Sequence, residues 1–210
     1  MIDMRAVPMR HPSIAALTLA TLALAGCNDA QLVNVWRDPD FHGPLKRLLV
    51  IAQRRDPTER RLWEDAIADQ MMKDDVQAIA SYHIYPDEPP GKHAMARAME
   101  DSSIDGALIV RALAPTRETR WVSGWNSVEP RTYYDPWGRG DVIVYRGVHH
   151  PGHREVDRIA RQQVTVWSAQ DDGRMVWAAT VEVENPDSRD EMRARFAKGV
   201  VPGLKKQGVL

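Results

Sequence analysis

Two uncharged apolar runs, separated by patterns typical of helices, constrain the fold of this 210-residue chain more than any other feature. Residues 48–52 read Leu-Leu-Val-Ile-Ala, and residues 106–110 read Gly-Ala-Leu-Ile-Val. Short continuous runs of this kind are typical of strands that are buried on both faces of a sheet. They predict buried central strands within residues 45–52 and 105–113.

A helix is predicted after the first of these strands, because the chain carries a helix-start signature there. Asp56, Pro57 and Glu59 are residue types preferred at the N-cap, first and third helical positions. The apolar residues that follow define one face of this helix: Leu62, Trp63, Ala66, Ile67 and Met71. The rest of its surface is expected to hold most of the polar residues, namely Arg60, Glu64, Asp65 and Lys73.

The remaining patterns add two more helices and several strands. One helix is expected over residues 92–101, and another after Pro186, to be ended or kinked at Pro202. The last helix repeats apolar residues at four-residue spacing: Met192, Phe196 and Val200. Further strands are expected over residues 31–36, 78–85, 116–124, 141–148, 161–169 and 174–184. The last two are joined by Asp172-Gly173, which is a hairpin signal.

These elements define the expected fold class. We predict an α/β fold, an α+β sandwich with a mixed β-sheet, in which the N-terminal half is β-α-β-α-β. A β-hairpin and a C-terminal helix complete it. The expected organisation is a single globular domain over residues 31–210.

The first 26 residues are read separately, as a signal peptide of the lipoprotein type. Arg5 and Arg10 precede an apolar run from Ile14 to Ala25, which is shorter than the roughly 20 residues that a membrane-spanning helix needs. The run ends in Leu24-Ala25-Gly26-Cys27, which resembles the bacterial lipobox. This resemblance implies cleavage between Gly26 and Cys27 and a diacylglyceryl group on the Cys27 sulfur. The alternative is a buried N-terminal helix.

Cys27 is the only cysteine, so the chain cannot form an internal disulfide. Residues 27–30 would be a short tether, because the first strand begins about four residues after the lipid, a reach of roughly 15 Å. We therefore expect a domain held close to its own membrane. Asn28, which is not the Asp that retains enteric lipoproteins in the inner membrane, favours the periplasmic face of the outer membrane.

Several motifs, taken in order, resemble an uncharacterised bacterial lipoprotein family, domain-of-unknown-function family 4136. They are Trp36-Arg-Asp-Pro39, Leu48-Leu-Val-Ile51, Glu64-Asp65, residues 105–111, Asp172-Gly-Arg-Met-Val-Trp177 and the C-terminal helix. The resemblance implies an α/β sandwich with a mixed sheet and no known reaction, so it carries no catalytic residue onto this chain. A stretch rich in Trp and Tyr, with histidines after it, departs from the family pattern.

That aromatic stretch is the candidate binding surface. It is expected to be a loop between the strands 116–124 and 141–148, and its candidate residues are Trp121, Trp125, Tyr133, Tyr134 and Trp137. Exposed Trp and Tyr offer large, rigid contact areas, which favours a role in binding a partner or ligand. Two alternatives remain open: the rings cover a face of the sheet, or they lie in the lipid headgroup zone.

The metal candidates are His149, His150 and His153, since imidazoles are common ligands of zinc, copper and nickel. No cysteine lies near them, and the alternative is a solvated loop rich in histidine. The sequence contains no familiar catalytic or phosphate-binding motif, and we expect no cofactor. The formal net charge of −1 provides no general basic field, so nucleic acid is not an expected partner.

From the sequence we thus predict a membrane-anchored, periplasm-facing lipoprotein without catalytic residues. Its expected role is to bind an envelope protein or to support envelope assembly. The alternatives are a module that binds a small molecule or glycan on its Trp residues, and a metal-dependent hydrolase built around the three histidines.

Overall fold

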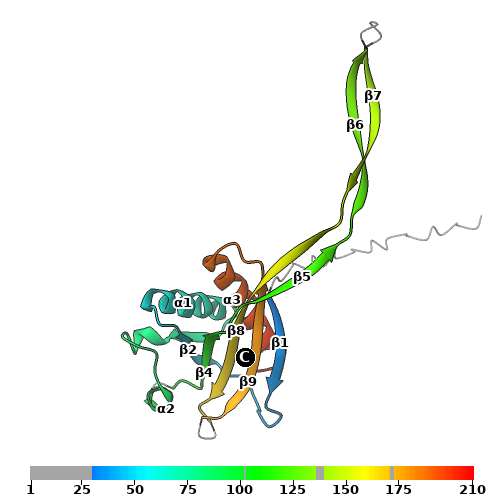
Figure 1. Ribbon diagram of the computed structural model, residues 1–210. Coiled ribbons are helices and arrows are strands. Elements are labelled where there is room, and N and C mark those ends of the chain that lie inside the picture. The colour runs from blue at the N-terminus through cyan, green and yellow to red at the C-terminus, as the bar shows by residue number, and fades with distance from the viewer. Residues whose placement is uncertain (1–29, 102, 136–139, 171–172) are drawn as a thin grey trace, which may run out of the picture.

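The computed structural model describes residues 30–101, 103–135, 140–170 and 173–210 (Figure 1). Within these residues the main sheet has the order β1-β9-β8-β4-β2-β3, with β5 paired to β8 outside that path. The strands are β1 (Ala30–Arg37), β2 (Arg47–Gln53), β3 (Gln77–Ala80), β4 (Gly106–Ala112), β5 (Thr116–Val122), β8 (His153–Ser168) and β9 (Met175–Glu184). β2 is parallel to β3 and β4, whereas the other pairs are antiparallel, so the sheet is mixed.

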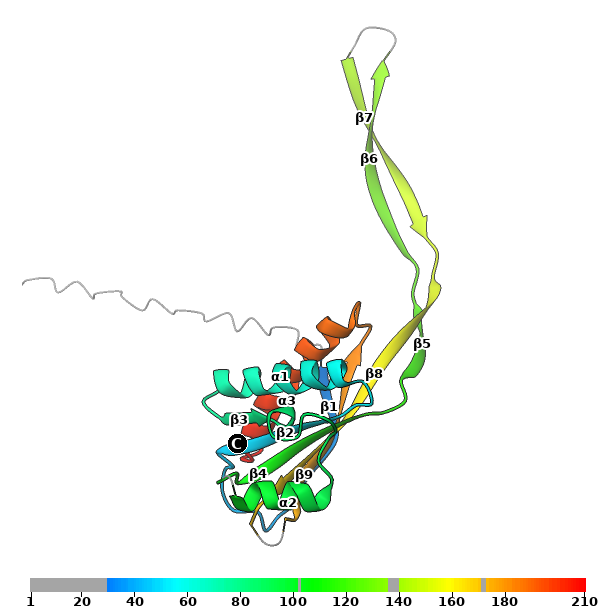
Figure 2. The same ribbon diagram turned by 90° about the vertical axis from the view of Figure 1, so that its left-hand side faces the viewer.

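Helices cover both faces of this sheet. α1 (Pro57–Lys73) and α3 (Arg189–Lys206) pack on one face, where the Trp63 and Phe196 rings meet edge to face with centroids 5.0 Å apart. α2 (Lys92–Asp101) covers the other face, above Leu49 and Ile51 of β2 (Figure 2). The predicted α+β sandwich with a mixed sheet is therefore confirmed.

The helix starting at Asp56 is confirmed, because the Asp56 carboxylate accepts hydrogen bonds from the amides of Thr58 and Glu59. The predicted division of its surface is partly wrong. Leu62 is 43% exposed, whereas Arg60 and Glu64 are buried. In a helix, residues 60, 64, 67 and 71 share one stripe, so these two polar residues lie in line with the buried Ile67 and Met71.

The buried Arg60, Glu64 and Ser81 form a cluster with the partly buried Tyr82 around one carboxylate, here called the Glu64 cluster. Glu64 Oε1 accepts from the amide of Ala52 at 3.0 Å, from Arg60 Nε at 3.0 Å and from Ser81 Oγ at 2.8 Å. Its Oε2 accepts from the amide of Tyr82 at 2.9 Å. One side chain of α1 thereby joins the helix to β2 and to the segment after β3.

The strand predicted over residues 78–85 is present but shorter than predicted, and this cluster explains where it ends. β3 ends at Ala80 and is followed by a single 3-10 turn, η1 (Ser81–His83). Ser81 and the backbone of Tyr82 turn toward Glu64 instead of continuing the sheet. The Tyr82 hydroxyl donates to Asp65, and this hydrogen bond raises the pKa of Tyr82.

The last helix passes through Pro202 and ends at Lys206, so Pro202 does not terminate it. The turn that contains Pro202 is held by packing: Val201 and Leu204 are fully buried, and Gly203 lies against Leu32 of β1. One turn earlier, Gly199 lies against Ala30. A Cβ on Gly199 would stand 2.7 Å from the Ala30 Cβ, so the start of β1 and α3 touch closely there.

This contact predicts that Gly199→Leu weakens the packing of α3 on the first strand. The added side chain has no room against Ala30, and we expect a loss of about 1–3 kcal/mol in the free energy of unfolding, as overpacked sites show. Urea denaturation followed by Trp fluorescence measures it. Lys198→Leu, at the neighbouring exposed position, is the control and should change little; equal losses in the two variants would show that the close contact is unimportant.

Candidate binding arm

A two-stranded ribbon, here called the arm (residues 116–135 and 140–159), leads away from the body of the protein in both views (Figures 1 and 2). Its base is the pair β5–β8, and its outer part is the hairpin of β6 (Trp125–Asp135) and β7 (Gly140–His150). At about 3.3 Å per residue, 20 residues from Thr116 to Asp135 extend roughly 65 Å. The loop predicted between two strands is therefore wrong, because most of it is strand.

The two parts of the arm share one register across a short unpaired stretch, here called the neck (residues 123–124 and 151–152). Val122 pairs with His153 and Trp125 pairs with His150, so equal numbers of residues separate the pairs on both strands. Glycines allow the backbones to approach at this neck. A Cβ on Gly152 would stand 2.7 Å from the Trp121 ring, and one on Gly124 would stand 2.6 Å from the carbonyl oxygen of His150.

The predicted aromatic residues occupy the arm where the structure describes them. Trp121, Trp125 and Tyr133 are 65%, 60% and 53% exposed. The backbone of Tyr134 belongs to β6, but its side chain and the whole of Trp137 lie outside the described residues. The aromatic residues are thus spread along the arm from its base to its outer part, instead of gathering in one loop.

The three histidines lie at the neck, and they belong to strands and not to a loop. The Trp125 and His150 rings are stacked with centroids 4.0 Å apart, and His150 Nε2 lies 3.0 Å from Ser127 Oγ. His149 Nδ1 lies 2.7 Å from the side-chain oxygen of Asn126, on the opposite face of β7. His153 begins β8. In the described part of the chain, no group of three His, Cys, Asp or Glu side chains is placed to hold a metal ion.

The outer hairpin has two unlike faces. Paired residues share a face, and one face presents the pairs Val128–Gly147, Pro130–Tyr145 and Thr132–Ile143. We call these six residues the apolar face; all are exposed, with Val128 at 67%, Ile143 at 58% and Tyr145 at 70%. The opposite face carries three charged residues in the same stretch, Glu129, Arg131 and Arg146, together with the exposed Val144. Trp125 and Tyr133 lie on this face too, at either end of the stretch.

A clasp of charged and polar groups fixes the base of the arm. Asp157 of β8, only 4% exposed, accepts from Arg120 Nε at 2.9 Å and from Asn185 Nδ2 at 2.7 Å. Asn185 also accepts from the amide of Arg158 at 2.7 Å, and its backbone has a positive φ of 44°. Both strands of the arm are thereby tied to the segment that follows β9.

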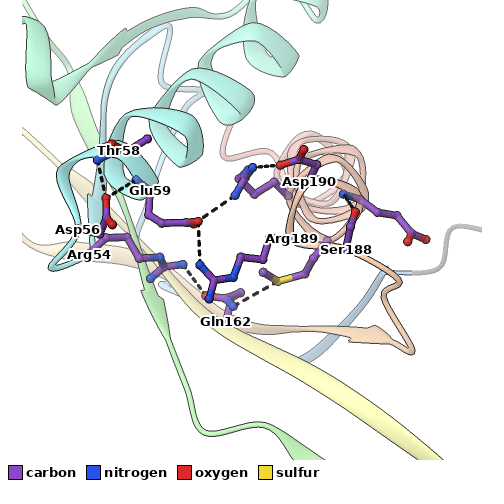
Figure 3. Close-up of polar contacts among 11 residues, drawn as sticks. Arg54, Asp56, Thr58, Glu59, Gln162, Ser188, Arg189 and Asp190 are labelled. Carbon is purple, nitrogen blue, oxygen red and sulfur yellow. Dashed lines mark hydrogen bonds and ion pairs between the residues drawn. The ribbon is translucent and has the colours of Figure 1, made fainter.

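A second set of polar contacts lies where the starts of α1 and α3 meet β8 (Figure 3). Glu59 accepts from Arg189 Nη1 and from Arg193 Nη1, each at 3.1 Å, and so links the two helices. Arg54 donates to Gln162 of β8 at 2.7 Å, and its guanidinium lies 4.5 Å from the centre of the Trp63 ring. Burial lowers the pKa of Arg54, and Glu59 opposes this effect. These contacts hold the helices and the arm-bearing strand together.

The clasp predicts a local effect of Asn185→Gly. Glycine tolerates the positive φ, so the variant removes the side-chain hydrogen bonds without adding backbone strain. We expect a loss of about 1–3 kcal/mol, because the buried Asp157 carboxylate loses a donor and the amide of Arg158 loses its acceptor. Hydrogen exchange of β5 amides should become faster while β4 amides stay protected. Unchanged exchange in β5 would contradict a role for the clasp in holding the arm.

None of the helices in the described residues is both long and apolar enough to span a membrane.

A comparison with protein families finds no match for the chain, and a comparison with curated proteins finds none either. Among solved structures, the chain is similar to a PelC dodecamer from Paraburkholderia phytofirmans, at 11% identity and a TM-score of 0.42, over 86% of this chain and 99% of that one. It is also similar to a PDZ domain protein from Parabacteroides distasonis, at 11% identity and a TM-score of 0.32, over 84% of this chain and 36% of that one. Likenesses at these TM-scores carry no information on function.

Proposed function

We propose that the protein is a non-enzymatic lipoprotein of the bacterial cell envelope that binds a protein partner with its arm. The observation that carries this proposal is the exposed outer hairpin. Two-stranded hairpins are at best marginally stable alone in water, and this one exposes apolar side chains on both faces, including Trp125, Val128, Val144 and Tyr145. Such a ribbon gains stability when another surface covers it.

The edge of β7 is the site at which a partner strand would add. β6 contains Pro130, which has no amide hydrogen and interrupts the row of donors on its strand. β7 contains no proline between Gly140 and His150, and Ile143 and Val144 have the branched side chains that favour strands. Within the described residues β7 pairs only with β6. An extended segment of a partner would therefore pair with β7 through backbone hydrogen bonds.

The envelope location rests on the N-terminal sequence. A lipoprotein signal peptide over residues 1–26 and a lipid on Cys27 would place the body beside a membrane, and Asn28 favours the outer one. Residues 26 and 27 lie outside the described part of the chain. The first described residue, Ala30, is 6% exposed and packs on Gly199, which is consistent with a body that begins directly after the anchor.

Photo-crosslinking in intact cells tests the proposed partner. A photoreactive amino acid at Val144, which is 46% exposed on β7, should yield a discrete crosslinked protein that is absent when the probe replaces Met72 on α1. Met72 is 54% exposed, so it matches Val144 in accessibility but lies on the body. Equal crosslinking at the two positions would contradict the proposal. Cys27→Ser should move the protein from the membrane fraction to the soluble one.

A further inference from the structure

The first strand begins at the end of the sheet from which the arm leaves. Ala30 of β1 pairs with Val183 of β9, and Val183 pairs with Ala160 of β8. Ile159, the neighbour of Ala160, pairs with Thr116 at the base of the arm. Because neighbouring strands are about 4.8 Å apart, Ala30 lies about 10 Å from the base of the arm.

The proposed lipid is attached close to this point. Cys27 precedes Ala30 by three residues, which span at most about 10 Å when extended. Ala30 is held in place by Gly199 and by its pairing with β9. A lipid on Cys27 would therefore keep the base of the arm within about 20 Å of the bilayer. Since the arm leads away from the body at this end, it lies on the membrane-proximal side of an anchored molecule (Figure 1).

One face of the outer hairpin has a composition suited to binding the surface of a lipid bilayer. Its apolar face carries no charge from Val128 to Thr132 or from Ile143 to Gly147, whereas Glu129, Arg131 and Arg146 lie on the opposite face. Over residues 125–150 three arginines balance three carboxylates, so the outer hairpin has no net charge that would repel an anionic or a neutral bilayer. Tyrosine favours the membrane interface, and Tyr145 on the apolar face is 70% exposed, whereas the exposed Trp125 and Tyr133 lie on the opposite face of the hairpin.

We infer that the apolar face of the arm docks on the lipid bilayer that holds the anchor, an inference that rests on the proposed lipid at Cys27. The apolar face would lie at the boundary between headgroups and acyl chains, with the charged residues toward water. A partner strand on the edge of β7 would extend the ribbon sideways and would leave this face free. The arm would then present β7 to its partner at a fixed height above the membrane.

Neighbouring residues on opposite faces of β7 provide the test. The full-length lipidated protein is reconstituted in vesicles of phosphatidylethanolamine and phosphatidylglycerol as Tyr145→Cys, Val144→Cys or Met72→Cys, each labelled with an environment-sensitive fluorophore. Because the lipid occupies the sulfur of Cys27, only the introduced cysteine reacts. We expect the label at position 145 to shift to the blue and to lose quenching by aqueous iodide. The labels at positions 144 and 72 should remain fully quenched.

Equal quenching at positions 145 and 144 in vesicles would overturn the inference and leave the proposed partner binding intact. Protection at position 145 that appears in detergent without vesicles, and grows with protein concentration, would assign the face to a second copy and would also overturn it. The intact mass of the same samples reports the lipid. An unmodified Cys27 would overturn both the proposed anchor and this inference, so the failures are distinguishable.

Discussion

Alanine in place of Glu64 lowers the free energy of unfolding by about 3–5 kcal/mol, the range seen when one partner of a buried ion pair is removed. The reason is the number of donors that this carboxylate serves. Arg60, which is 2% exposed, would keep its charge without the carboxylate, and Ser81 and the amides of Ala52 and Tyr82 would lose their acceptor. Urea denaturation followed by the fluorescence of the buried Trp63 and Trp177 measures the loss.

Two further variants separate the charge from the packing. Asp65→Ala, at the next position of α1, removes only the hydrogen bond from the Tyr82 hydroxyl and should cost about 1 kcal/mol. The double variant Arg60→Met with Glu64→Leu removes both charges and should recover part of the loss, since apolar pairs of similar volume replace buried ion pairs well. A Glu64→Ala variant no less stable than Asp65→Ala would show that the cluster does not organise the core.

Removing the outer arm abolishes capture of the partner and leaves the body almost as stable as before. A two-residue Asn-Gly turn in place of residues 123–152 would join Val122 to His153, which are already paired. The deleted part contributes none of the residues of the two core clusters, so the free energy of unfolding should change by about 1 kcal/mol or less. Crosslinking pulldowns from cells should then fall to background.

The trimmed protein provides its own control, because it keeps Cys27, the clasp and the packed core. It should still fractionate with the membrane and should still unfold cooperatively. A trimmed protein that captures the same partner as the full chain would place the binding site on the body. A loss of more than about 3 kcal/mol, comparable to breaking a core contact, would show that the arm is part of the core and not a separable binding element.

The elements specified by local chemistry were predictable from the sequence. The start of α1 follows from the side chain of Asp56 and the preset φ of Pro57, and the hairpin between β8 and β9 follows from Asp172-Gly173 between two alternating runs. The buried strands β2 and β4 follow from their continuous apolar runs. In each case the determining residues lie within a few positions of one another.

The Glu64 cluster was not predictable in the same way, because its donors come from Ala52, Ser81 and Tyr82, which are distant in sequence. The spacing of Arg60 and Glu64 with Ile67 and Met71 places the four residues on one stripe of the helix, and this indicates burial. The charged side chains of Arg60 and Glu64, however, favour the prediction of an exposed position. The outer hairpin was missed for a different reason. It buries neither face in the protein, so burial imposes no simple alternation on residues 125–135, and Pro130 resembles a loop signal.

Amide hydrogen exchange of β7, compared between native envelopes and the purified protein, tests most directly whether the arm is the binding element. If a partner strand pairs with β7, the amides of residues 140–150 should exchange markedly more slowly in native envelopes than in the purified protein. The amides of the buried strand β4 should be equally slow in both samples. Equal exchange of residues 140–150 in the two samples would contradict the account, because it would leave the edge of β7 without a partner in the cell.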